Sequence, residues 1–84
     1  MKYPSHVWKQ LKNKTCDEIV ATLLKDGFTC VKMSGAIRTY LHSDGRTVTI
    51  HYHPQKTYGP KLLKQLLDDI GWTINDMVRL KFIK

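Results

Sequence analysis

The fold is decided by one stretch of the chain, GAIRTYLHSDGRTVTIHYHP, which covers residues 35–54. It holds two β-prone runs, Ala36 to His42 and Thr47 to His53, and the Ser43-Asp44-Gly45 segment between them is typical of a tight turn. A third β-prone run, Phe28 to Met33, precedes this stretch. The three runs together predict a three-stranded antiparallel meander.

Amphipathic helices are predicted on both sides of the meander. Thr15 and Glu18 have the spacing of a capping box, so the first helix is expected to begin at Thr15 and to end at Gly27. Pro60 suits the first position of a second helix, which Gly71 ends. The predicted apolar stripes of the two helices are Ile19, Val20, Leu23 and Leu24, then Leu62, Leu63, Leu66, Leu67 and Ile70.

A short third helix is expected after Trp72, because Thr73 and Asp76 repeat the cap spacing, and it should run to about Leu80. The resulting order is an α+β arrangement, α-β-β-β-α, in which both main helices can bury their stripes on one face of the sheet. Double-stranded-RNA-binding domains have this topology, although topology alone does not establish function.

The chain is short and strongly basic. Its 84 residues suffice for one core, and 14 Lys and Arg against 7 Asp and Glu give a formal net charge of +7. We therefore expect an acidic partner, a basic N-terminal extension over residues 1–14 and one domain over residues 15–84. Two cysteines make no disulfide framework and no apolar run could cross a bilayer, which favours the cytoplasm.

The positive charge is concentrated between Gly27 and Leu67, where Asp44 is the only acid. Duplex RNA is contacted mainly through phosphates and 2′-hydroxyls, and such contact requires a basic face. The candidate RNA-binding residues are Lys32, Arg38, Arg46, Lys56, Lys61 and Lys64. The alternative is that these side chains form only a solvated surface.

The His51-Tyr52-His53 segment places two imidazoles on the same side of the third strand, since side chains alternate along a strand. Imidazoles titrate near neutral pH, so such a pair can move protons during RNA cleavage, with His42 as a further candidate. The spacing does not favour a metal site, and we expect no metal or other cofactor. The alternative is that both histidines simply face water.

The surroundings of His51 depend on the length of the hairpin turn. A two-residue turn at Asp44-Gly45 places Arg38 opposite His51 and gives one fully apolar face. A three-residue turn with a bulge at Gly45 shifts the pairing by one residue and places Ile37 opposite His51. The apolar pattern favours the two-residue turn.

The same stretch resembles the HicA toxins, also called YcfA-like proteins. The resemblance rests on Asp44-Gly45-Arg46 in the turn, on the strand after it and on His51-Tyr52-His53-Pro54, and it extends over about Thr15 to Gly71. It implies a double-stranded-RNA-binding-like fold, metal-independent cleavage of mRNA, growth arrest and neutralisation by a HicB-type antitoxin. The family has Gly, a small residue and then the catalytic His, whereas this chain has Gly35, Ala36 and Ile37.

An isoleucine cannot exchange a proton, so the resemblance carries over fold and RNA contact but not catalysis. Three hypotheses follow. In the first, His51 acts as general acid or base, with His53 or His42, and a cation stabilises the developing charge; the candidate cations are Lys32, Arg38 and Arg46. In the second, the protein is a catalytically silent module that binds RNA or the antitoxin. In the third, it is a structural or interaction protein that has lost RNA binding.

Overall fold

A computed structural model describes residues 3–84 and confirms the predicted α+β fold. The chain runs through α1 (Ser5–Leu11), α2 (Cys16–Asp26), β1 (Thr29–Ser34), β2 (Ile37–Leu41), β3 (Thr47–His51), α3 (Pro60–Ile70) and α4 (Ile74–Arg79). The strands form one antiparallel sheet in the order β1-β2-β3. Within residues 3–84, no helix is long and apolar enough to span a membrane.

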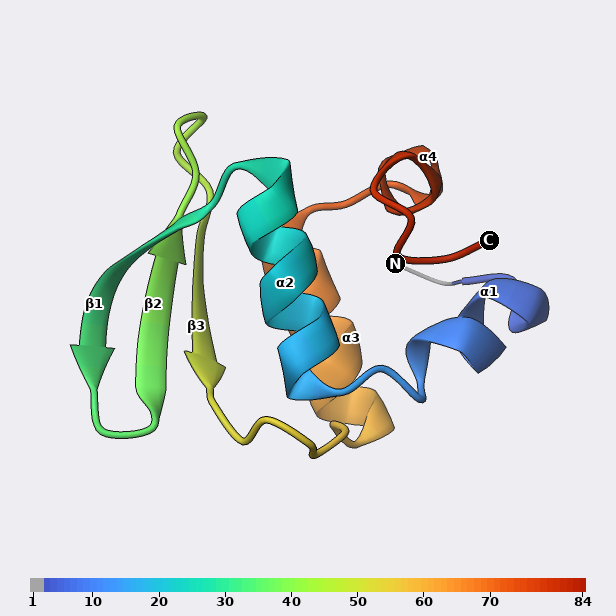
Figure 1. Cartoon of the computed structure of the whole chain (residues 1–84). Helices are drawn as coiled ribbons and strands as arrows, with labels where there is room; N and C mark the ends of the chain where they lie inside the picture. The colour runs from blue at the N-terminus through green and yellow to red at the C-terminus, as the bar shows by residue number, and fades with distance from the viewer. Residues whose placement is uncertain (1–2) are drawn as a thin grey trace.

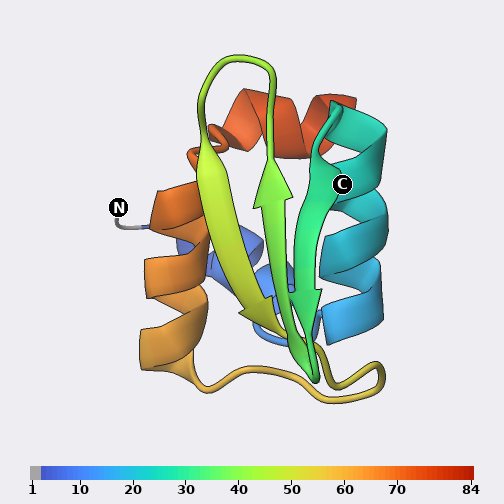
Figure 2. The same cartoon turned by 90° about the vertical axis from the view of Figure 1, so that its left-hand side faces the viewer.

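The elements are arranged in three layers (Figure 1). Helices α2 and α3 cover one face of the sheet, and the shorter helices α1 and α4 lie on the side of α2 and α3 that is turned away from the sheet. The opposite face of the sheet carries no helix (Figure 2). The fold therefore leaves one sheet face open to solvent.

Local cap interactions determine where the helices begin and end. In α2, the Thr15 hydroxyl accepts from the Glu18 backbone N–H, and the Glu18 carboxylate accepts from the Thr15 N–H at 3.1 Å. Thr73 and Asp76 form the same box before α4. These capping boxes confirm the predicted helix starts, since each satisfies backbone N–H groups that have no partner inside the helix.

The prediction of a two-residue hairpin turn, which the apolar pattern favours, is wrong. Ile37 pairs with His51 and Tyr40 with Val48, while the His42 N–H donates to the Arg46 carbonyl across a three-residue turn. Gly45 has a φ of +99° there, a backbone conformation that L side chains rarely adopt. The shift by one residue directs the Tyr40 ring, rather than Ile37 and Leu41, into the core.

The core lies between the sheet and the helices and extends into the third layer. Trp72, Tyr40 and Ile70 are almost fully buried, and so is Phe82. Two positions of the predicted stripes are corrected: Leu24 is 54% exposed and Leu62 58%, because each lies at the margin of its helix's buried face.

The N-terminal segment contributes to this core. Val7 and Leu11 on α1 are buried, and Trp8 is half-buried against the core. Residues 1 and 2 of the basic extension expected over 1–14 lie outside the described residues. Helix α1 therefore serves as a packing element as well as a carrier of lysines.

Candidate active site

A pocket lies where β3 leaves the sheet and the chain turns towards α3. It is a cavity of about 380 Å³ lined by His51, His53, Lys56, Thr57, Tyr58 and Leu62. The structure thus brings together both histidines of the His51-Tyr52-His53 segment and one predicted RNA-binding lysine. Imidazole groups can transfer protons, and an ammonium group can stabilise negative charge.

The loop that carries Lys56 is fixed to the start of α2. The backbone N–H groups of Cys16 and Asp17 donate to the carbonyl oxygens of Lys56 at 2.9 Å and of Pro54 at 3.1 Å. The first N–H groups of a helix have no partner within it, so the loop satisfies groups that would otherwise need water. The loop is therefore held in one place although it contains no regular structure.

Tyr58 fixes the back of the pocket. Its hydroxyl lies 3.1 Å from Cys16 Sγ and 3.2 Å from the His51 carbonyl oxygen. Burial raises the pKa of Tyr58 well above its usual value, and the hydrogen bond to Cys16 raises it further. The phenol therefore stays protonated at neutral pH and positions the end of β3 without acting as a base.

His51 stands directly across from Ile37 on the open face of the sheet. The Tyr52 N–H donates to the Ala36 carbonyl, which makes Ile37 and His51 a pair without mutual backbone hydrogen bonds. Side chains in such pairs approach most closely, with Cβ atoms about 4.5–5.5 Å apart. The His51 imidazole is therefore adjacent to the Ile37 side chain.

His42 and Arg46 do not belong to this pocket. They lie beside the β2–β3 turn at the other end of the sheet, and the five residue-to-residue steps from Arg46 to His51 along β3 span about 17 Å. His42 Nδ1 accepts from the Asp44 N–H, which leaves Nε2 as the donor to the Asp26 carbonyl at 2.9 Å. Both ring nitrogens of His42 therefore bond to backbone groups, and the side chain has a structural role.

The Arg46 guanidinium is used within the protein. It donates to the Asp44 carboxylate at 2.8 Å, to the Ile70 carbonyl at 2.8 Å and to the Asp26 carboxylate at 3.3 Å. These bonds join the hairpin turn to the ends of α2 and α3. The structure therefore places Arg46 in an internal network, away from the pocket.

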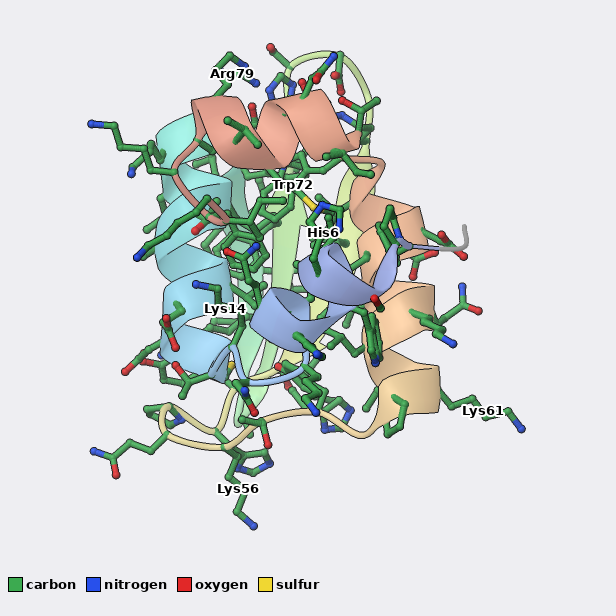
Figure 3. The ribbon with its side chains drawn as sticks, turned by 90° about the vertical axis from the view of Figure 1, so that its right-hand side faces the viewer. His6, Lys14, Lys56, Lys61, Trp72 and Arg79 are labelled. Atoms are coloured by element: carbon green, nitrogen blue, oxygen red, sulfur yellow. The ribbon has the colours of Figure 1, made fainter. Side chains whose placement is uncertain are left out.

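The other predicted RNA-binding residues are not gathered in one place, and Lys64 lines a separate cavity beside Tyr3 and Trp8. Lys32 shares the open sheet face with Thr39, its partner across the strands. Arg38 lies on the helix side of the sheet, with its guanidinium 3.7 Å from the centre of the Tyr52 ring. Lys61 projects into solvent from the start of α3, at the same end of the molecule as Lys56 (Figure 3).

Sequence reasoning missed Tyr58 and Leu62 as pocket residues. Residues 55–59 read as a polar loop, and Leu62 was assigned to a buried helix stripe. The aromatic ring of Tyr58 within this polar segment was the available signal. No sequence signal pointed to the contact between this loop and Cys16, about 40 residues away.

Within residues 3–84, no group of three or more His, Cys, Asp and Glu side chains could hold a metal ion. The chemical groups on the pocket wall are imidazole, ammonium, hydroxyl and aliphatic side chains. The arrangement is suited to acid–base chemistry on an anionic substrate.

The fold and the pocket define a small, basic α+β protein of the double-stranded-RNA-binding-like type with a paired-histidine pocket. The family model described as the HicA toxin of bacterial toxin-antitoxin systems matches residues 16–72. The chain belongs to the HicA toxin family, and this membership implies a toxin with an antitoxin partner. No curated protein matches the chain.

Proposed function

We propose that this HicA-family protein binds mRNA and cleaves it at the pocket that contains His51 and His53. The observation that carries the proposal is the pairing of His51 with Ile37, since the resemblance to the HicA toxins implies a catalytic histidine at position 37. An imidazole placed one strand away, on the same open face, can reach a scissile phosphate bound at the family's site.

The chemistry follows from the groups on the pocket wall. One imidazole accepts the proton of the ribose 2′-hydroxyl while the 2′-oxygen forms a bond to phosphorus. The bond from phosphorus to the 5′-oxygen breaks at the same step. The other imidazole gives a proton to that leaving oxygen. Lys56 stabilises the negative charge on the non-bridging oxygens. The products are a 2′,3′-cyclic phosphate and a 5′-hydroxyl.

The test is cleavage of a single-stranded RNA by the purified protein in the presence of a metal chelator. We expect His51→Ala to lower the cleavage rate by about 10²–10⁴-fold, the usual contribution of a general acid or base, with RNA affinity little changed. His6→Ala is the matched control, because His6 is exposed on α1, away from the pocket (Figure 3). Wild-type rates in His51→Ala, or cleavage of a 2′-deoxy substrate, would refute the proposal.

A second candidate function is a catalytically silent module that binds RNA or the antitoxin. The presence of Ile37, 41% exposed and unable to exchange a proton, favours it. RNA binding without any cleavage product, and no growth arrest on induction in a bacterial host, would establish this function. RNA affinity that is unchanged between low and high salt would contradict both RNA-binding functions, since phosphate contacts are salt-dependent.

A further inference from the structure

A second cavity, separate from the active site, lies between α1 and α3. It has a volume of about 250 Å³ and is lined by Tyr3, Ser5, Trp8 and Lys64. The rings of Tyr3 and Trp8 are nearly parallel, with centroids 6.2 Å apart and 18° between their planes. Lys64 Nζ lies 5.1 Å from the centre of the Trp8 ring. We call Tyr3, Trp8 and Lys64 the aromatic site.

The two rings are only half-buried. Tyr3 and Trp8 pack against the core but keep part of their surface exposed, whereas the other tryptophan, Trp72, is almost fully buried. Burial, with the nearby Asp68 carboxylate, raises the pKa of Tyr3, so its phenol stays neutral. The site thus offers uncharged aromatic rings with an ammonium group beside them.

The aromatic site and the active site lie on two sides of the same helix. Leu62 of α3 lines the active-site pocket, and Lys64, two residues further along the helix, lines the aromatic site. Residues two apart on a helix point in nearly opposite directions. Lys61 projects from this same first turn into solvent (Figure 3).

We infer that the aromatic site is a stacking subsite for an unpaired base of single-stranded RNA, part of the same strand that is bound at His51. Exposed aromatic rings beside a lysine are how proteins bind single strands without sequence preference, because every base has a flat face. The net charge of the chain is +7, and residues 1–14 contain no acidic side chain. Both features favour a polyanionic ligand over a peptide that carries no acidic side chains. This inference rests on the proposed RNA binding.

Tyr3 and Trp8 precede the matched family region, residues 16–72. The subsite is therefore supplied by α1 and the residues before it, with only Lys64 coming from the matched region. It would lengthen the RNA footprint beyond the cleavage site and select unpaired strands, since a duplex does not present its bases to stack on protein rings.

The experiment uses the full chain carrying His51→Ala, so that the probe stays intact, and a fluorescently labelled 12-nucleotide oligouridylate. Stacking of one base typically contributes a factor of about 5 to 150 in affinity. We expect Trp8→Leu to weaken binding about tenfold and Trp8→Phe, which keeps a ring, less than threefold. Lys12→Gln, at the C-cap of the same helix, removes one exposed charge without changing either ring and is the control for electrostatics.

One further measurement does not depend on how well Trp8→Leu folds, and a second reports whether that variant is folded. Oligouridylate should quench the tryptophan fluorescence of the protein, and Trp8→Phe should abolish the quenching, since Trp72 is buried. In chains that retain His51, Trp8→Leu should cleave a dinucleotide at the wild-type rate if it is folded, because a dinucleotide bound at the cleavage site has no further base to stack on the aromatic site.

The outcomes separate this inference from the proposed function. If the 12-mer binds but Trp8→Leu matches the starting protein and quenching is absent, the subsite is refuted and RNA binding stands. Equal weakening by Trp8→Leu and Lys12→Gln also refutes stacking. If the protein binds no RNA at any salt concentration, both are refuted. If Trp8→Leu weakens binding of the antitoxin but leaves RNA binding unchanged, the aromatic site binds a protein partner instead.

Discussion

Asp26, at the end of α2, holds together the hairpin end of the molecule. Its carboxylate is only 7% exposed and accepts from Trp72 Nε1 at 2.9 Å, from Arg46 at 3.3 Å and from Arg79 at 3.3 Å. These three donors come from the β2–β3 hairpin, from the segment after α3 and from α4. We predict that Asp26→Asn, which keeps the shape and removes the charge, strongly destabilises the fold.

The magnitude follows from the exposure of the partners. Removing one member of a buried ion pair typically costs about 3–5 kcal/mol, because the other charge is left without compensation. Here the side chain of Arg46 is 28% exposed and that of Arg79 is 60% exposed, so water replaces part of the lost interaction. We therefore expect a loss of about 2–3 kcal/mol, which lowers the melting temperature of a domain this size by roughly 8–24 °C.

The assay is urea unfolding followed by circular dichroism. Asp69→Asn is the matched control, since it makes the same change of charge at an exposed position of α3 and should alter the free energy of unfolding by less than about 0.5 kcal/mol. If the two variants unfold at the same urea concentration, the Asp26 network does not stabilise the protein and the reasoning is wrong.

Thr15→Ala removes the side-chain cap of α2 and should cost about 1 kcal/mol in thermal unfolding, against a smaller change for Thr49→Ala on the open sheet face. Backbone hydrogen bonding by Thr15 lowers the pKa of Glu18 below 4.5, so its stabilisation is present above that pH and is lost as the pH falls through the lowered pKa. Melting temperatures should fall on acidification below about pH 4.5, and a pH dependence that Glu18→Gln leaves unaltered would contradict this. Ile37→His should raise RNA cleavage at least about tenfold by adding an imidazole opposite His51, and an unchanged rate would count against a productive site there.

The helix boundaries were predictable because the interactions that fix them are local. Thr15 bonds Glu18 and Thr73 bonds Asp76, each three residues apart, so the sequence spacing contains the geometry. Gly27 ends α2 with a φ of +105°, again a property of a single position. Such features need no knowledge of the rest of the fold.

The hairpin register was not predictable in the same way, because both turn lengths give a plausible apolar pattern. The choice depends on which residue enters the core, Leu41 or Tyr40, and that is settled by packing against helices distant in sequence. The outcome directs Arg38 to the helix side, where it stacks on Tyr52. A pattern of apolar and polar residues does not contain this information.

The residues of the candidate site also differ in whether their place depends on local sequence or on contacts with distant residues. The prediction that one strand carries both histidines is wrong, because β3 ends at His51 and His53 lines the pocket from the loop that follows. Tyr58 lines the pocket as well, and its hydroxyl contacts Cys16, 42 residues away. Arg46 shows the opposite error, since charge counting cannot tell that Asp26, 20 residues earlier, already holds its guanidinium. Charge alone predicts a basic protein, and only the fold tells which cations remain available to a ligand.

The third layer explains how a toxin domain of this size can leave a whole sheet face open. One face of the sheet is covered by α2 and α3, and those helices in turn need cover on their far side, which Val7 and Leu11 of α1 and Met77 and Phe82 near α4 supply. All four residues lie outside the matched region 16–72, yet every residue that lines the active-site pocket lies inside it. The terminal segments thus stabilise the fold from the side of α2 and α3 that is turned away from the sheet, and the opposite face of the sheet stays uncovered.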